Sequence, residues 1–291
     1  MEKLNTAKLE NPVVMTEFSP EPVCGVYREI GWRPLVQIIG LGTVGEAQAH
    51  VFRKLGCNVC VYDPFLNEAP FEDIAFSANR PFSECDITFI CTMENQVENV
   101  VKELKVSGYS GLIVIKSSVV PRTTKTLMAK YGFHICHNPE FMRERTSLQD
   151  VLIPDRIVIG QCCEKHGKLL ESLYRPLNCQ VIVVDPTTSE TAKLLGNSYL
   201  ALMITFWNQA HQLAQKLDIK TSDLAKIVTT DKRISKHGTK WFGESFDEKC
   251  LPKDLEHLIS AFQAADLQPT LLEATRQINN ALARAEGQNN A

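Results

Sequence analysis

A glycine-rich turn between two apolar runs constrains the fold of this chain more than any other feature. Residues 34–63, PLVQIIGLGTVGEAQAHVFRKLGCNVCVYD, read as a strand, a turn with Gly40, Gly42 and Gly45, an amphipathic helix and a second strand. This order is typical of a βαβ unit of about thirty residues. Such glycines permit a tight turn and a close approach of the backbone to a pyrophosphate, which the helix N-terminus then faces. The unit therefore predicts a dinucleotide site, with a purely structural glycine turn as the alternative.

The residue that ends the second strand indicates which dinucleotide binds. Asp63 stands where a carboxylate accepts a hydrogen bond from a ribose 2′-hydroxyl and repels a 2′-phosphate. We therefore expect NAD rather than NADP as the cofactor.

Strands and helices alternate along the next part of the chain. Strand-like runs occur at 86–92, 111–118, 134–140, 155–160 and 180–185, and after Pro186 helical patterns take over at 189–219, 221–230 and 252–285. They predict an α/β fold with a Rossmann-like, doubly wound parallel sheet, followed by an all-helical central domain. We place an N-terminal extension at 1–33, the NAD-binding domain at 34–186, the helical domain at 187–285 and a frayed tail at 286–291.

Composition argues against several classes of partner. The 291 residues carry a net charge of −3 without a block of Lys or Arg, so neither nucleic acid nor an anionic membrane is expected as a partner. No apolar run has transmembrane length, and no signal-peptide pattern opens the sequence. The ten cysteines are scattered through the predicted elements, which suits a cytoplasmic, reduced protein best.

Two short motifs resemble metal or redox sites. CNVC (57–60) lies in an alternating strand pattern without a second such pair, and HICH (134–137) puts its two imidazoles on opposite faces of a strand. Core packing is the better interpretation of both motifs, so we expect no metal site.

Polar side chains gather near the ends of two further predicted strands. Ser118 closes the run at 111–118, at the strand end where an open α/β sheet binds its ligands. In HNPEFMRERTSLQD, Asn138 would cap a helix that begins at Pro139, and Glu140 and Glu144 would share one face of that helix. Paired carboxylates can move protons or hold water, and a solvated surface pair is the alternative.

The long helix predicted for 189–219 carries a second pair of candidates. Lys193 and Asn197 stand four residues apart, so an ammonium and an amide can face one reacting oxygen. Most such pairs are exposed, but the apolar neighbours of this pair favour a functional role.

Cys250 is the candidate nucleophile. It precedes a helix that we expect to begin at Pro252, and both the helix N-terminus and Lys253 favour a thiolate there. Asp254 would orient a water molecule or hold Lys253. A buried, inert cysteine is the alternative, against which the charged neighbours argue.

Taken in order, five of these motifs resemble those of the nucleotide-sugar 6-dehydrogenases, the UDP-glucose/GDP-mannose dehydrogenase family. They are GLGTVG, NPEFMRE, IPDRIVIG, AKLLGNSYLA and CLPKD, and the resemblance runs from about residue 34 to 285. It implies that a sugar CH₂OH is oxidised to a carboxylate while two NAD⁺ are reduced at one site, an activity of polysaccharide biosynthesis. It also implies a nucleotide sugar such as UDP-glucose as the substrate, and a homodimer formed through the helix 189–219.

The resemblance assigns roles to the residues of the helical domain. Cys250 resembles the nucleophile that traps the aldehyde as a thiohemiacetal and then carries a thioester. Lys193 and Asn197 would stabilise the oxyanion, and Asp254 would hold a water that serves as base.

The remaining candidates match positions of the NAD-binding domain and its surroundings. Glu140 and Glu144 correspond to acids that contact substrate or cofactor and help to hydrolyse the thioester, and Ser118 corresponds to a hydroxyl beside the reacting centre. The implied cofactor-binding residues are Gly40, Gly42, Thr43, Val44, Gly45, Asp63, Thr92, Ser118, Glu144 and Lys253.

Three features depart from the family pattern. FDEKC places Asp247 and Glu248 where the family has two glycines, and their charges would repel a diphosphate. CTMEN (91–95) replaces a stretch that usually carries Thr-Pro. The family continues into a third, nucleotide-sugar-binding domain, which we expect this sequence to lack.

Two other functions therefore stay open at this stage. The departures favour a non-catalytic NAD-binding or structural scaffold. A dehydrogenase of small hydroxyacids would share both domains and the Lys/Asn pair, but it would not need Cys250.

Overall fold

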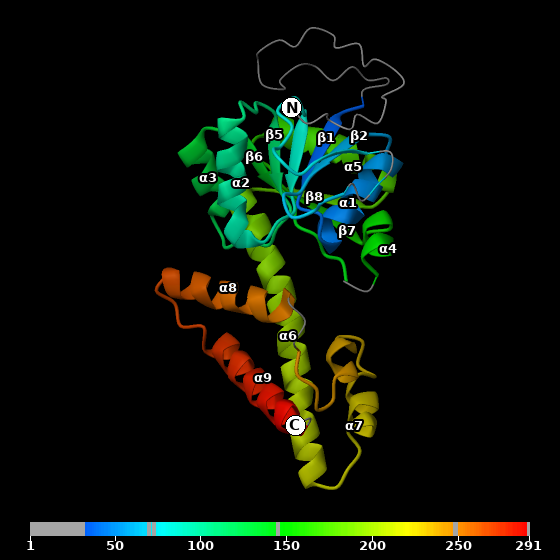
Figure 1. Ribbon diagram of the computed structural model, residues 1–291. Helices are drawn as coiled ribbons and strands as arrows, with labels where there is room; N and C mark the ends of the chain where they lie inside the picture. The colour runs from blue at the N-terminus through cyan, green and yellow to red at the C-terminus, as the bar shows by residue number, and fades with distance from the viewer. Residues whose placement is uncertain (1–32, 69–70, 72–73, 144–145, 247–249, 290–291) are drawn as a thin grey trace. The chain divides into compact units, whose positions relative to one another are not determined.

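The computed structural model describes residues 33–68, 71, 74–143, 146–246 and 250–289 (Figure 1). Almost all of the expected N-terminal extension, the candidate Glu144, and the acids Asp247 and Glu248 that depart from the family pattern lie outside the described residues. The chain divides into two compact units, residues 1–190 and 191–291, and the division falls within helix α6.

The first unit contains an eight-stranded sheet in the order β3-β2-β1-β4-β5-β6-β7-β8. Its strands are β1 (Leu35–Ile39), β2 (Asn58–Tyr62), β3 (Ala75–Ser77), β4 (Ile87–Ile90), β5 (Leu112–Ile115), β6 (Ile135–His137), β7 (Arg156–Gly160) and β8 (Gln180–Val184). Neighbouring strands are parallel except for β6 and β7, which are antiparallel. The Rossmann-like fold class is confirmed, because the first six strands follow the order of a doubly wound dinucleotide-binding sheet. The sequence reasoning missed β3, since three residues leave no periodic signal.

Helices cover both faces of this sheet (Figure 1). On one face, α1 (Thr43–Lys54) and α5 (Glu164–Tyr174) contribute Phe52, Leu169 and Leu170 to a core cluster with the strands. On the other face, α2 (Glu94–Val106) and α3 (Thr123–Tyr131) contribute Val97, Leu104 and Leu127 to a second cluster. Short helices α4 (Ser147–Leu152) and η2 (Arg175–Leu177) complete the unit. Both faces of the sheet are thus buried, as the unbroken apolar runs of its central strands require.

The second unit is helical, as expected. It comprises most of α6 (Pro186–Lys216), together with α7 (Thr221–Val228), η3 (His237–Lys240), α8 (Cys250–Ala264) and α9 (Thr270–Asn289). Buried side chains of α6, α8 and α9, among them Leu194, Leu255 and Leu272, form its core. Helix α8 begins two residues earlier than expected, and Pro252 is accommodated because first-turn N–H groups have no acceptor within the helix. No helix in the described part of the chain is long and apolar enough to span a bilayer.

The prediction that a helix starts at Pro139 is wrong. Residues 138–143 are not helical, and α4 begins only at Ser147. Asn138 does not act as a cap, because tertiary hydrogen bonds engage its amide group. Its Nδ2 donates 2.7 Å to the carbonyl oxygen of Val158 on β7. Glu140 therefore does not lie on a helical face as predicted.

Asn138 also stabilises the junction between the antiparallel strands β6 and β7. Among the described residues, a single residue pair joins β6 to β7. The Oδ1 atom of Asn138 accepts hydrogen bonds from Lys116 Nζ at 3.0 Å and from the Tyr174 hydroxyl at 2.5 Å. This buried amide thus links β5, β7 and α5 across a short junction.

We expect Asn138→Ala to lower the free energy of unfolding by about 2–4 kcal/mol, because it removes three hydrogen bonds from a buried site. Urea unfolding measures the change. The matched control is Asn99→Ala, since Asn99 is exposed on α2, and its replacement should change the free energy by less than about 0.5 kcal/mol. Equal effects of the two substitutions would contradict the role assigned to Asn138.

Candidate active site

The carboxyl ends of the parallel strands gather several predicted site residues at one edge of the sheet. Gly40 follows β1, Asp63 follows β2, Thr92 lies just past β4 and Ser118 lies just past β5. Strand order reverses between β1 and β4, and open α/β sheets bind their ligands at such a point. The geometry therefore groups these four predicted residues of the first unit.

The three glycines of the turn have different surroundings. Gly40 has φ +88°, and a Cβ there would lie 2.9 Å from Thr92 Cγ2. A Cβ on Gly45 would lie 1.9 Å from the carbonyl oxygen of Gly40, so the close packing of α1 on the turn excludes any side chain. A Cβ on Gly42, in contrast, would meet no described atom within 4 Å. The fold itself does not require glycine at 42, whereas a ligand that approaches the backbone there would.

The N-terminus of α1 follows this open position. Thr43 and Val44 are its first residues, and Gly42 is the N-cap residue. Since glycine has no side chain, it cannot cap the first-turn N–H groups of α1 by a side-chain hydrogen bond. First-turn N–H groups carry partial positive charge and favour an anion. The arrangement fits the pyrophosphate of a dinucleotide.

Asp63 contacts the glycine-rich turn directly. Its Oδ2 accepts a hydrogen bond from the backbone N–H of Leu41 at 2.8 Å, and its Oδ1 accepts one from that of Phe65 at 2.9 Å. The carboxylate is therefore held beside the turn in a defined orientation. Nearby, the Thr92 hydroxyl is buried and has no hydrogen-bond partner in the described part of the chain. Ser118 is half-buried.

A pocket of about 550 Å³ opens in the first unit beside Lys116, just past β5. Glu140 lines it and is half-buried, and its Oε2 accepts a hydrogen bond from the backbone N–H of Met142 at 2.9 Å. Arg143, also at the wall, pairs with Asp150 at 2.6 Å, and this guanidinium holds the pKa of Asp150 well below its usual range. The pocket thus combines cationic and anionic side chains in its walls, a combination suited to a polar ligand.

The second unit brings together candidates from α6 and α8. Asp254 is fully buried, and its Oδ2 accepts a hydrogen bond from Asn197 Nδ2 at 2.6 Å. Its Oδ1 pairs with Lys253 Nζ, also at 2.6 Å. Lys193 is buried one helical turn before Asn197, and the exposed Cys250 lies one turn before Asp254. A buried carboxylate one turn after a solvent-accessible thiol therefore holds an amide from α6 and an ammonium from α8.

The two motifs interpreted as core residues differ in how deeply their side chains are buried. Cys60 of CNVC is buried on β2 with its Sγ 3.2 Å from that of Cys85, whereas Cys57 lies outside the strand. In HICH, His137 is buried, with its Nδ1 2.9 Å from the Ser189 hydroxyl. His134 is exposed instead and lies beside cysteine side chains that the sequence reasoning missed. The pattern CC-x-x-H after a strand was the available signal for them.

Two family models match the chain and together cover more than half of it. Residues 68–178 match the model described as "UDP-glucose/GDP-mannose dehydrogenase family, NAD binding domain". Residues 187–281 match the model described as "UDP-glucose/GDP-mannose dehydrogenase family, central domain". The glycine-rich turn precedes the first matched range, so its assignment depends on the geometry given above.

Curated relatives and solved structures agree with these models. The UDP-glucose 6-dehydrogenase of Rickettsia conorii is 35% identical over 74% of this chain and 50% of its own length. That of Campylobacter jejuni is 32% identical over 74% of this chain and 54% of its own. The structure of a UDP-glucose dehydrogenase from Pyrobaculum islandicum is similar, with a TM-score of 0.78, 27% identity and coverage of 89% of this chain and 71% of that one. The chain spans about half the length of the curated relatives it matches.

The glycines of the turn give a matched pair of test variants. We expect Gly45→Ala to lower the melting temperature by about 5 °C or more, because the new methyl group overlaps a backbone oxygen. Gly42→Ala should leave the melting temperature of the free protein within about 1 °C, since the methyl group meets open space. It should nevertheless reduce the stabilisation by added NAD, which thermal unfolding with and without NAD measures. Undiminished stabilisation of Gly42→Ala would contradict the placement of the pyrophosphate.

Proposed function

Since the chain belongs to the UDP-glucose/GDP-mannose dehydrogenase family, we propose that it is an NAD-dependent nucleotide-sugar 6-dehydrogenase that acts on UDP-glucose or a similar sugar. The observation that carries the proposal is the buried Asp254, which lies one helical turn after Cys250 and holds the side chains of Asn197 and Lys253. A hydroxyacid dehydrogenase has no use for that thiol, and an idle scaffold does not require a solvent-accessible thiol one turn before these polar groups.

NAD fits the edge of the sheet at Gly42. The open space at this glycine, the α1 N-terminus and the carboxylate of Asp63 suit the pyrophosphate and the adenosine ribose. When bound, NAD⁺ supplies a hydride acceptor for both oxidation steps. Thr92 and Ser118, past the ends of neighbouring strands, are proposed to contact its other half or the reacting sugar carbon.

The chain's own residues carry out the remaining chemistry. After the first hydride has left the CH₂OH carbon and a proton its hydroxyl, the Cys250 sulfur bonds to the aldehyde carbon. The oxygen of the resulting thiohemiacetal is held by Lys193 and Asn197. Loss of a second hydride and of the hydroxyl proton leaves a thioester on Cys250. Water then adds to this carbon, the C–S bond breaks, and the products are the carboxylate and the free thiol.

Asp254 positions these groups in our proposal. Its two oxygens hold the Asn197 amide and the Lys253 ammonium, so neither side chain has to be ordered when the substrate arrives. A water that hydrogen-bonds within this group would serve as the base for the hydroxyl protons. Glu140, in the wall of the pocket of the first unit, and Glu144 are proposed to contact the substrate or assist thioester hydrolysis.

Cofactor stoichiometry tests the mechanism. With UDP-glucose or GDP-mannose, the chain should form two NADH for each sugar acid, measured by absorbance and by chromatography of the product. Cys250→Ser should abolish formation of the acid, because no thioester forms. Cys179→Ser is the matched control, since Cys179 lies in the first unit between η2 and β8, and it should retain full activity. A wild-type chain that binds NAD but oxidises none of a panel of nucleotide sugars would contradict the enzyme and favour the scaffold.

We also propose that α6 mediates a homodimer. Leu195, Tyr199, Phe206 and Leu213 are exposed along it, and the last three repeat every seven residues. Such a heptad-spaced apolar stripe is typical of a helix that packs against another helix. A second copy of the chain supplies the same stripe and can cover it across a twofold axis.

A charge placed in the middle of this stripe should prevent the association. We expect Phe206→Glu to convert the dimer into a monomer in sedimentation velocity, because a buried carboxylate is costly. The matched control is Ile227→Glu, since Ile227 is an exposed apolar residue of α7 away from the stripe. A dimer that persists in Phe206→Glu would show that another surface mediates association.

A further inference from the structure

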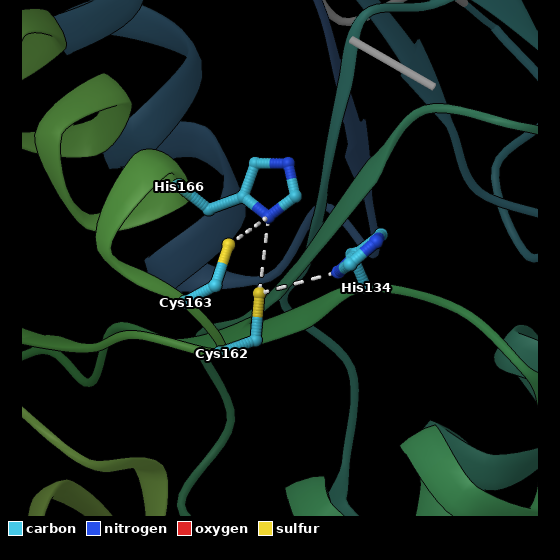
Figure 2. A group of neighbouring side chains, drawn as sticks. All are labelled: His134, Cys162, Cys163 and His166. Atoms are coloured by element: carbon cyan, nitrogen blue, oxygen red, sulfur yellow. Dashed lines mark hydrogen bonds between the residues drawn. The ribbon is translucent and has the colours of Figure 1, made fainter. Parts of the chain in front are cut away.

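Two cysteines and two histidines meet at the margin of the sheet, apart from every residue used above. They are His134, Cys162, Cys163 and His166, and their ligand atoms all lie within 4.8 Å of one another (Figure 2). His166 Nδ1 lies 3.1 Å from the Sγ of Cys162 and 3.2 Å from that of Cys163. His134 Nδ1 lies 3.8 Å from the Cys162 sulfur. The four side chains thus point toward a common centre.

The strand reversal is what brings these residues together. Gly160, the last residue of β7, pairs with His137, the last residue of β6, and because the strands are antiparallel the chain after β7 runs back along β6 toward its start. His134 immediately precedes β6, and Cys162 and Cys163 follow β7. Cys163 caps α5, which places His166 in the first turn of that helix. Three ligands therefore come from one short loop and helix start, and the fourth comes from the neighbouring strand.

We propose that these four side chains bind a zinc ion. Two thiolates and two imidazoles form a common tetrahedral ligand set for zinc, and softness and geometry both select zinc over calcium or magnesium. With bonds of about 2.3 Å to sulfur and 2.0 Å to nitrogen, the edges of such a tetrahedron are about 3.3–3.8 Å. Three of the sulfur–nitrogen distances are 3.1, 3.2 and 3.8 Å, and the other ligand atoms lie within 4.8 Å of one another, so shifts of up to about 1 Å would complete the site.

Hydrogen bonds among the four side chains leave some of their polar atoms without a suitable partner. A single atom, His166 Nδ1, faces two sulfur atoms, yet it can donate one proton or accept one but not both. A central cation would satisfy all four ligand atoms at once. Moreover, Cys136 directs its thiol at the Cys162 sulfur, 3.7 Å away, as a donor to a metal-bound thiolate would. The exposed side of His134 leaves a path for the ion to enter.

A disulfide explains the cluster less well. Consecutive Cα atoms are about 3.8 Å apart, below the usual Cα separation of about 4.4–6.8 Å in disulfides, so Cys162 and Cys163 are poorly suited to pair. A bridge between Cys136 and Cys162 would leave Cys163 and both histidines unused. The arrangement of all four side chains is thus better accounted for by a metal than by oxidation.

The position of the cluster points to a structural role. The cluster follows the carboxyl end of β7. Because β7 runs antiparallel to β6 and its parallel neighbours, this end lies at the edge of the sheet opposite the carboxyl ends of β1 and β4. At that margin the ion would clamp the junction between β6 and β7, which a single residue pair joins in the described part of the chain. Its loss should therefore loosen β7, β8 and α5 first.

Metal analysis of the untagged chain tests the proposal. Protein produced in zinc-supplemented medium and purified without chelator should contain about one zinc per chain by mass spectrometry of the elements. Cys163→Ser should lose at least nine-tenths of it, whereas the matched control Cys179→Ser should retain it. Chelator should lower the melting temperature of the wild-type chain by about 5 °C or more, and hydrogen exchange should accelerate first in β7 and β8.

Cobalt provides a second measurement on a variant that should fold. Metal-depleted wild-type protein titrated with Co²⁺ should develop the absorption of thiolate-bound, tetrahedral cobalt. His134→Asn replaces an exposed side chain and should weaken cobalt binding at least tenfold. The proposal is overturned if the wild-type chain binds neither zinc nor cobalt, or if Cys163→Ser keeps its zinc. It is also overturned if the wild-type protein, as purified, contains no metal and carries a Cys136–Cys162 disulfide.

Discussion

The reversal of strand direction between β6 and β7 is the constraint on which the rest of the sheet unit depends. One residue pair, His137 and Gly160, joins the two strands among the described residues, yet β7, β8 and α5 are all attached beyond it. A Cβ on Gly160 would lie 2.8 Å from both Pro186 Cα and Ser189 Cβ, so the first turn of α6 also packs on this pair. The buried amide of Asn138 secures one side of the junction. The proposed zinc site would secure the other side, which explains why ligand-type side chains gather at an otherwise weak point.

Function in both units depends on polar groups that the fold fixes in advance. At the sheet edge, Asp63 is held by backbone N–H groups beside a turn in which Gly42 alone faces open space. In the helical unit, Asp254 is fully buried and holds one donor from α6 and one from α8. Such prearranged groups stabilise developing charge without reorganisation during the reaction. The free-energy cost of burying the Asp254 carboxylate is offset by its contacts with Asn197 and Lys253. Folding stability and the proposed chemistry therefore require the same contacts.

Local patterns predicted most of the fold, because burial on one or both faces leaves a period in the sequence. The βαβ unit at Gly40, the long helix and the pairing of Lys253 with Asp254 follow from such spacing or from the family resemblance. The hydrogen bond from Asn197 to Asp254 joins two helices and was not predicted. Contacts between distant segments left no such signal. Asn138 and Pro139 form a strong helix-start pattern, but the carbonyl of Val158 outcompetes the helix for the amide. The group around His134 depends on the antiparallel β6–β7 pair, and strand direction cannot be read from an apolar run.

The thiols of this chain show how environment rather than residue type decides chemistry. Cys60 is buried, and its hydrogen bond with Cys85 together with burial raises its pKa well above the usual value, so the sulfur stays protonated and inert. Burial likewise raises the pKa of Cys57 to about 11. The Cys163 sulfur lies 3.2 Å from the imidazole of His166, and a metal that binds there would displace the thiol proton. Cys250 is exposed at the start of α8, beside polar groups that Asp254 fixes, and this combination of access and organised charge is what a nucleophile needs.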